Sequence, residues 1–191
     1  MATSIMWFRR DLRLSDNPAL VRAVGEAGGD GEVVAFFCLD GRLRRPAGAA
    51  RLAFLSGCLQ ALDESVGGNL VVRSGHPATK LPALARQVGA DRVFVTADFG
   101  PYGRARDDEV EDALGRRDVE LVRVGSPYAV APGDLLNASG HPFKVFTPYL
   151  RAWRAHGWPA PVPAPGRVSW AAGVEGDGVP APPPVDADLP P

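Results

Sequence analysis

A fivefold alternation of short apolar runs with longer stretches of helical periodicity constrains the fold of this chain more than any other feature. The apolar runs are rich in Val, Ile, Leu and Phe and do not strictly alternate apolar with polar residues, which is typical of strands buried on both faces. We expect strands at residues 4–8, 32–39, 69–73, 92–96 and 119–124. This pattern predicts an α/β domain with a Rossmann-like five-stranded parallel sheet, strand order 3-2-1-4-5, and helices on both faces.

The stretches between the runs carry signals of crossover helices. One apolar stripe recurs at spacings of three and four residues, at Leu52, Leu55, Leu59, Leu62 and Val66. Other helices are expected to begin near prolines, because proline suits the first helical turn: after Ser15 or Asp16 at Pro18, at Pro77, and at Pro101. A last helix-like apolar face lies within residues 144–156.

Proline usage divides the 191 residues into two parts. Ten of the 19 prolines fall in residues 157–191, where such a composition favours extended, polyproline-like chain. We therefore expect one domain at residues 1–156 and a Pro-rich linker at residues 157–191, whose few large apolar residues could lie along another surface.

Composition excludes several classes of protein. The 21 Lys and Arg residues are balanced by 22 Asp and Glu residues, so no global positive field recruits nucleic acid. Two cysteines are too few for a disulfide framework or a Cys-based zinc site, and the longest apolar run, residues 33–39, is too short to span a membrane. We expect a cytoplasmic protein without a metal site or membrane association.

Polar residues that directly follow strands are the candidates for a ligand site, because ligands of open parallel sheets bind beyond the carboxyl ends of the strands. The loops in question are residues 9–13, 38–45 and 98–104. They contain neither a GxGxxG nor a GxxxxGK[ST] motif, which argues against dinucleotide dehydrogenases and P-loop enzymes.

Residue type alone leaves the roles of the charged residues in these loops open. The arginines Arg9, Arg10 and Arg13 could be solvated, paired with Asp11 and Asp16, or part of a fork for a planar, carbonyl-rich ligand. Asp98 could likewise be a helix N-terminal charge or a ligand acceptor. The three widely spaced histidines lie in no catalytic or metal-binding motif, so no catalytic residue is expected.

Five segments resemble, in order and spacing, the N-terminal antenna-binding α/β domain of the DNA photolyase and cryptochrome family. They are WFRRDLRLSDNPAL (7–20), FFCLD (36–40), ARLAFLSGCLQAL (50–62), PYGRARD (101–107) and GHPFKVFTPYLRAW (140–153). The resemblance covers nearly all of residues 4–156 and is closest to deoxyribodipyrimidine photolyases, which repair cyclobutane pyrimidine dimers in DNA with light. It implies that the helical domain that binds FAD is missing here, so this chain alone is expected to be inactive and to bind DNA weakly or not at all.

The resemblance also implies a site for a light-harvesting antenna chromophore, with 8-hydroxy-deazaflavin favoured over methenyltetrahydrofolate. Carried over position by position, the pocket or its wall comprises Arg10, Phe37, Cys38, Leu39, Asp40, Arg51, Leu55, Asp98, Tyr102 and Gly103. Gly100 stands where similar sequences often have glutamate, so one polar anchor for the chromophore is missing.

Two other interpretations stay open at this stage. One is a cryptochrome-type blue-light receptor, which shares this domain and signals without repairing DNA. The other is an unrelated adenine-nucleotide-binding α/β module, although the chain lacks the SGGxDS and HIGH phosphate-binding signatures.

Overall fold

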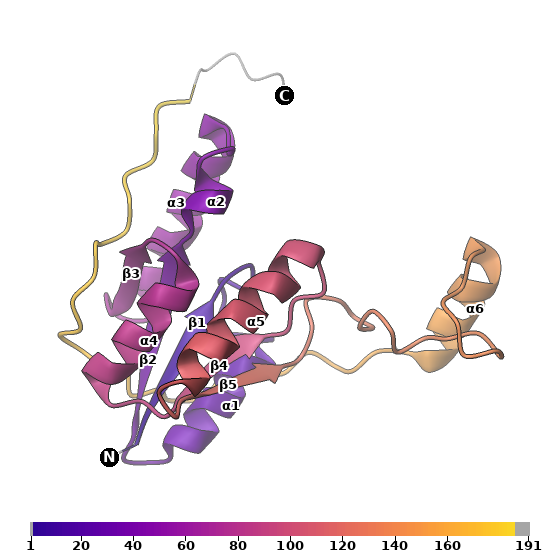
Figure 1. The fold of residues 1–191 in the computed structure, drawn as a ribbon, viewed down its shortest axis with the longest axis horizontal. Helices are drawn as coiled ribbons and strands as arrows, with labels where there is room; N and C mark the ends of the chain where they lie inside the picture. The colour runs from indigo at the N-terminus through magenta and orange to yellow at the C-terminus, as the bar shows by residue number, and fades with distance from the viewer. Residues whose placement is uncertain (1, 186–191) are drawn as a thin grey trace.

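The computed structural model describes residues 2–185 and contains a five-stranded parallel sheet of order β3-β2-β1-β4-β5 (Figure 1). The strands are β1 (Thr3–Phe8), β2 (Glu32–Leu39), β3 (Leu70–Ser74), β4 (Arg92–Thr96) and β5 (Glu120–Val124). The predicted sheet and its strand order are confirmed, and each predicted boundary lies within one residue of the observed one.

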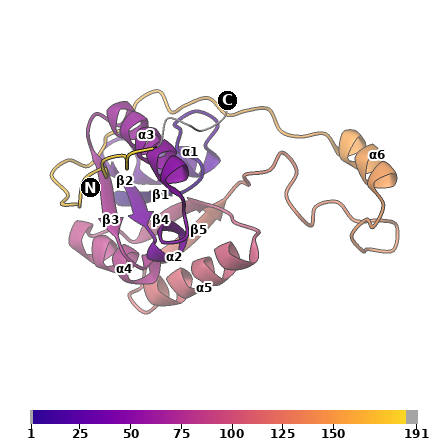
Figure 2. The same cartoon turned by 90° about the horizontal axis from the view of Figure 1, so that it is seen from above.

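Helices cover both faces of the sheet, as predicted. The helices are α1 (Pro18–Ala27), α2 (Gly41–Arg44), α3 (Ala49–Ser65), α4 (Pro77–Val88), α5 (Pro101–Gly115) and α6 (Phe146–His156). Helices α1 and α3 lie on one face and α4 and α5 on the other (Figure 2). The short helix α2 was not predicted, because its four residues GRLR carry no periodic signal.

Two apolar clusters, one on each face, form the core. Trp7 and Phe36 belong to the cluster under α4 and α5, whereas their chain neighbours Phe8 and Phe37 belong to the cluster under α1 and α3. Successive side chains of a strand point to opposite faces. Both faces are therefore buried, which explains the unbroken apolar runs in the sequence.

The start of α1 differs from the expectation. Asn17, not Ser15 or Asp16, caps the helix, and its Oδ1 accepts a hydrogen bond from the Leu20 amide at 3.0 Å. Asp16 instead adopts a left-handed backbone conformation with φ of 50°. Asn17 sits directly before the helical proline, which is where a cap must lie to reach the first-turn amides.

The proline-rich segment returns to the domain and lies against it, as Figure 1 shows along the β3 side. We call residues 162–180 the C-terminal strap. Its Ser169 and Ala171 exchange backbone hydrogen bonds of 2.8 and 3.0 Å with Val33 at the start of β2. The Asp177 amide donates to the Val72 carbonyl of β3 at 2.7 Å. The apolar side chains of the strap pack on the two core clusters, so they do lie along another surface, and that surface belongs to this same domain.

Helix α6 stands apart from the rest of the molecule in both views (Figures 1 and 2). It forms within the segment that was expected to be helical, and it has no buried residue among those described. No helix within residues 2–185 combines the length and the apolarity needed to cross a membrane.

Candidate functional site

A cavity of about 270 Å³ opens at the carboxyl ends of the strands, and we call it the strand-end cavity. It is lined by Trp7, Arg9, Arg10, Phe37, Cys38, Asp40, Leu43, Pro77, Asp98, Tyr102 and Arg106. Because β1 lies between β2 and β4 in the sheet, the loops that follow these three strands meet over one crevice. The strand order predicted from the sequence therefore determines which loops surround the cavity.

Six of the ten site residues expected from the sequence line this cavity: Arg10, Phe37, Cys38, Asp40, Asp98 and Tyr102. Gly103 lies directly behind it, since a Cβ at this position would overlap the Asp98 carboxylate. Glycine there lets α5 approach that carboxylate closely.

Three of the expected residues, Leu39, Arg51 and Leu55, do not line this cavity. Leu39 is buried in the cluster under α1 and α3, and Leu55 of α3 packs against the same cluster. Arg51 is exposed on α3. Phe37 belongs to the same cluster as Leu39 and yet lines the cavity, so the face of the sheet alone does not decide which residues reach it.

Five lining residues are outside the ten carried over from the family: Trp7, Arg9, Leu43, Pro77 and Arg106, of which Arg9 and Leu43 lie in loops that the sequence analysis named as candidates. A signal existed for Arg106, because it follows Tyr102 by four residues on α5 and so shares its helix face. Leu43 belongs to the unpredicted helix α2. Both Arg9 and Arg106 stack on the Trp7 ring, with guanidinium carbons 4.8 and 5.2 Å from its centroid.

Two buried carboxylates hold the arginines in place. Asp107 Oδ1 lies 2.6 Å from Arg9 Nη1 and 2.8 Å from Arg106 Nη2. Asp98 accepts hydrogen bonds of 2.9 Å at both oxygens from Arg10, and its Oδ2 lies 3.3 Å from Arg106 Nη2. The arginines of the first loop are therefore paired, and Arg9 and Arg10 take partners near α5, far along the chain.

Asp98 has little capacity left for a ligand. Its carboxylate also accepts a hydrogen bond of 3.2 Å from the Gly100 amide, and its side chain is only 7% exposed. We therefore assign Asp98 to holding Arg10 and Arg106, whose guanidinium planes form part of the cavity wall.

Asp40 is as buried as Asp98 but keeps more acceptor capacity, because each of its oxygens accepts one hydrogen bond whereas each Asp98 oxygen accepts two. Its Oδ1 accepts from the Arg42 amide at 2.9 Å and so caps α2. The Tyr102 hydroxyl donates to Asp40 Oδ2. Burial, reinforced by this bond, raises the pKa of Tyr102. Burial, reinforced by Asp40, also raises the pKa of Cys38 to about 12, and its thiol donates to the Gly75 carbonyl at 3.4 Å.

A protonated phenol and a protonated thiol are poor nucleophiles at neutral pH. The strand-end cavity is therefore suited to binding a planar group between aromatic and guanidinium surfaces rather than to attacking it. Within residues 2–185, no group of three or more His, Cys, Asp or Glu side chains is arranged to hold a metal ion.

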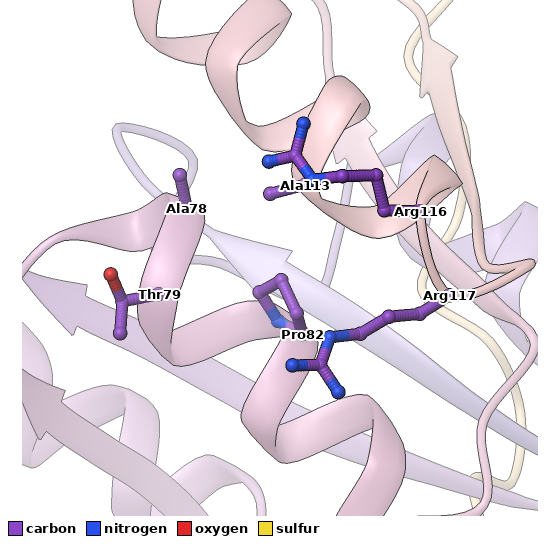
Figure 3. A pocket seen from close by; sticks show the side chains of 6 residues that line it. All are labelled: Ala78, Thr79, Pro82, Ala113, Arg116 and Arg117. Atoms are coloured by element: carbon purple, nitrogen blue, oxygen red, sulfur yellow. The ribbon is translucent and has the colours of Figure 1, made fainter.

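Two larger hollows have no aromatic residue in their lining. One of about 430 Å³ lies between α4 and α5, and Figure 3 shows the guanidinium groups of Arg116 and Arg117 directed to different parts of it. The other, of about 600 Å³, lies near Gly28 and Val33 at the amino ends of the strands, where ligands of parallel sheets do not bind. The strand-end cavity is the better candidate because several polar groups converge on it.

Fold and cavity together define a doubly wound α/β domain with a ligand crevice at its carboxyl edge. The family model described as DNA photolyase matches residues 4–166, and the chain belongs to this family. Within it the chain corresponds to the N-terminal α/β domain, so the resemblance inferred from the five segments is confirmed at the level of the family.

Curated relatives carry the same family name. The chain is 36% identical over 169 residues to a deoxyribodipyrimidine photo-lyase of Synechococcus, covering 86% of this chain and 34% of that protein. It is 38% identical over 187 residues to that of Streptomyces griseus, covering 94% of this chain and 40% of the relative. The chain thus spans little more than a third of the length of these relatives.

Solved structures agree on the fold. The crystal structure of a class III photolyase from Agrobacterium tumefaciens has 31% identity and a TM-score of 0.81, covering 93% of this chain and 37% of that one. A Synechocystis cryptochrome has a TM-score of 0.82 at 23% identity, with 96% and 40% of the two chains covered. A Sulfolobus tokodaii photolyase, solved with two FAD molecules, has a TM-score of 0.76 at 22% identity, with 91% and 40% covered. At these identities the last two similarities show the fold alone.

Proposed function

We propose that this domain binds a light-harvesting chromophore in the strand-end cavity, as part of a protein that repairs cyclobutane pyrimidine dimers in DNA with light. The observation that carries the proposal is the cavity itself. It joins the indole of Trp7, the ring of Tyr102 and two buried guanidinium groups at the carboxyl edge of the sheet. Flat aromatic and guanidinium surfaces favour a flat, conjugated ligand.

The chromophore that suits these walls best is 8-hydroxy-deazaflavin, ahead of methenyltetrahydrofolate. Its ring system is planar, largely apolar, and edged with carbonyl and hydroxyl groups. Arg10 is the donor for a carbonyl, and Asp40 is the acceptor for a hydroxyl or ring N–H. Absorption of light belongs to the chromophore, while the protein supplies its position and a dry, polarised surrounding.

The repair chemistry lies outside this domain. In the longer protein, energy absorbed here would pass to a reduced FAD in a helical domain, and the FAD would donate an electron to the dimer. Because residues 1–191 hold no segment that resembles that domain, we expect no repair of a thymine-dimer oligonucleotide by this chain under blue light with reduced FAD added. Repair at a rate above the protein-free control would contradict this assignment.

Fluorescence titration with 8-hydroxy-deazaflavin tests chromophore binding. Leu43 lies at the mouth of the cavity and is 52% exposed, so Leu43→Trp should fill the cavity without disturbing the core and should weaken binding at least tenfold. Arg44→Trp places the same bulk on the next residue of α2, which does not line the cavity, and should bind as the wild type does. Excess ATP should not displace the chromophore.

Two further variants test the polar groups. Asp98→Ala releases Arg10 and Arg106 and should weaken binding about tenfold or more, because the two guanidinium groups are then no longer fixed in the cavity wall. Gly100→Glu restores a carboxylate beside the site and should tighten binding by a similar factor. The pocket assignment is wrong if neither the wild type nor Gly100→Glu binds, or if Leu43→Trp binds as tightly as Arg44→Trp.

A further inference from the structure

The segment that joins β3 to α4 forms part of the wall of the strand-end cavity. β3 ends at Ser74, and α4 begins at Pro77, which lines the cavity. Only Gly75 and His76 lie between them, and we call residues 74–77 the β3–α4 connection. Because three residue steps span at most about 11 Å, a displacement of Ser74 is transmitted to Pro77.

Two hydrogen bonds attach Gly75 to the end of β2. Its amide donates to the Leu39 carbonyl at 3.1 Å, and its carbonyl accepts from the Cys38 thiol at 3.4 Å. Cys38 itself lines the cavity. Gly75 has a φ of 140°, which residues with a side chain rarely adopt, and a Cβ there would lie 2.6 Å from Lys80 Cε. The connection is therefore held in one glycine-dependent conformation on its cavity side.

The strap holds the connection from the opposite side. The Ser74 amide donates to Asp177 Oδ2 at 2.6 Å, and the Asp177 amide donates to the Val72 carbonyl at 2.7 Å. β3 is the outer strand of the sheet, so no further strand is there to pair with these backbone groups. The bond from Ser74 lowers the pKa of Asp177. The carboxylate is therefore charged at neutral pH, and its bond to the amide is charge-assisted.

Other contacts attach the strap independently of the Asp177 carboxylate. Before it, Arg73 donates to the Glu175 carbonyl at 2.8 Å. After it, the Ser56 hydroxyl of α3 donates to the Pro180 carbonyl at 2.5 Å. The Asp177 side chain is exposed, so its substitution leaves the two core clusters intact. Removal of this carboxylate should release the Ser74 amide while the strap stays attached on both sides.

We infer that Asp177 is a positioning residue for the strand-end cavity, and that docking of the strap on β3 is coupled to occupation of the cavity. The inference rests on the proposed function for the ligand and adds a regulation of its site. Without the bond from Ser74, Gly75 can leave its conformation, and the wall formed by Cys38 and Pro77 is no longer fixed. A ligand that needs the fixed wall then binds more weakly, and by linkage the bound ligand strengthens the docking of the strap.

Thiol labelling of Cys38 tests the positioning role without any ligand. The chain has two cysteines, both free, so Cys58→Ser leaves Cys38 as the only thiol. In this background Asp177→Ala should raise the labelling rate of Cys38 at pH 8 at least threefold, because the thiol loses its fixed acceptor at Gly75. Asp177→Asn keeps an oxygen for the Ser74 amide and should restore the slow rate.

Glu175→Ala is the matched control for this labelling. The residue is exposed in the same strap, and its contact with Arg73 is made by the backbone carbonyl, which the substitution keeps. Its labelling rate should equal that of the parent Cys58→Ser protein. The positioning role is refuted if Asp177→Ala labels Cys38 no faster than the control does, or if Asp177→Asn labels it as fast as Asp177→Ala.

Hydrogen exchange and titration test the coupling to the ligand. Saturating 8-hydroxy-deazaflavin should slow exchange of the Asp177 amide in the wild type at least threefold, although this amide is on the strap and outside the cavity. In fluorescence titrations, Asp177→Ala should bind the chromophore at least threefold more weakly than the wild type. Asp177→Asn and Glu175→Ala should bind it within twofold of the wild type. A purely structural role for Asp177 would not make its amide respond to a ligand.

Equal binding of 8-hydroxy-deazaflavin to all four proteins, or an Asp177 amide that exchanges at the same rate with and without it, would refute the coupling and leave the proposed function intact. Absence of binding to any of them would overturn the proposed function and, with it, the coupling to a ligand. In that case the labelling of Cys38 still decides whether Asp177 positions the cavity wall.

Discussion

Asp107 lies between the side chains of Arg9 and Arg106, and the three side chains are only 2, 10 and 7% exposed. Burial raises the pKa of Asp107, and Arg9 opposes that rise. Its Oδ2 has no hydrogen-bond partner among the described residues, so the ion pairs at Oδ1 are what compensates its burial. Both arginines in turn form the wall against which Trp7 packs.

Asp107→Ala should therefore lower the free energy of unfolding by about 3–5 kcal/mol, because it leaves Arg9 buried without its counter-ion and leaves Arg106 with Asp98 alone. Urea denaturation measures the free energy of unfolding of the wild type and the variant. Asp108→Ala is the matched control: this neighbouring carboxylate is 73% exposed and pairs with Arg123 at 3.3 Å, so its loss should cost less than about 1 kcal/mol. Equal losses for the two variants would contradict the role given to Asp107.

The reactivity of the buried Cys38 thiol is a second property of a single residue that can be tested. Its pKa of about 12, against an ordinary 9.0, leaves about a thousandfold less thiolate at pH 8 than a free thiol has, since each pKa unit is a factor of ten. In native protein at pH 8, a thiol reagent should label Cys58 in Cys38→Ser while leaving Cys38 in Cys58→Ser almost unreacted. Comparable labelling rates would show that Cys38 is not held in its protonated, buried form.

The same shift predicts a pH dependence of stability. A raised pKa in the folded state contributes stability that is fully present below pH 9.0, the unfolded value, and lost as pH rises towards about 12. The free energy of unfolding of the wild type should fall across this window more steeply than that of Cys38→Ser. Parallel curves for the two proteins in urea titrations would contradict it.

At the scale of elements, the C-terminal strap covers the outer edge of β3, the first strand of the sheet order. An uncovered edge strand exposes unpaired backbone groups. Besides the bond from Asp177 to Val72, the Ser74 amide donates to Asp177 Oδ2 at 2.6 Å and Arg73 donates to the Glu175 carbonyl. Because Gly75, the next residue, lines a hollow of about 300 Å³ beside Asp40, the strap also fixes one wall of that hollow.

Gly176 is the position that permits this contact, since a Cβ there would lie 2.8 Å from the Val72 carbonyl oxygen. Gly176→Ala should push the strap away from β3 and raise the hydrogen-exchange rates of the Ser74 and Asp177 amides at least tenfold. Gly166→Ala is the control, because that residue has open space around its Cβ position. Unchanged protection in Gly176→Ala would mean that the strap is not held at this point.

At the scale of the whole molecule, the described residues form a core domain with its strap and one helix, α6, that contributes nothing to the core. Val145 and Phe146 at its start are 62 and 69% exposed. Trp153 stacks on Trp158 with ring centroids 4.6 Å apart, so the aromatic residues of this region contact one another. An isolated helix of 11 residues is marginal in water.

Phe146→Ala should therefore change the free energy of unfolding by less than about 0.5 kcal/mol. Leu59→Ala, at a fully buried site on α3, should cost about 2–5 kcal/mol. Urea denaturation monitored by circular dichroism measures both changes in the free energy of unfolding. A loss above about 1 kcal/mol for Phe146→Ala would show that α6 packs on the domain in solution.

Local and short-range patterns in the sequence sufficed for the sheet, its order, the main helices and the meeting of three loops over one crevice. Apolar runs fix the strands, and the rules for crossover connections leave few orders to choose from. The position of the candidate site at the carboxyl edge of the sheet follows from that order alone. The extended character of residues 157–185 likewise follows from their prolines.

Which side chains face the cavity was decided only by tertiary structure. Phe37 and Leu39 pack in the same cluster on one side of the sheet, but only Phe37 lines the cavity. Arg9 finds Asp107 across 98 residues, and residue type could not choose that partner over nearby Asp11. The docking of the strap on β3 depends on a gap at Gly176 that exists only once both segments are placed. Sequence pattern specifies elements because its periods are local, whereas pairing of charges and close approach of backbones depend on distances that the folded chain alone creates.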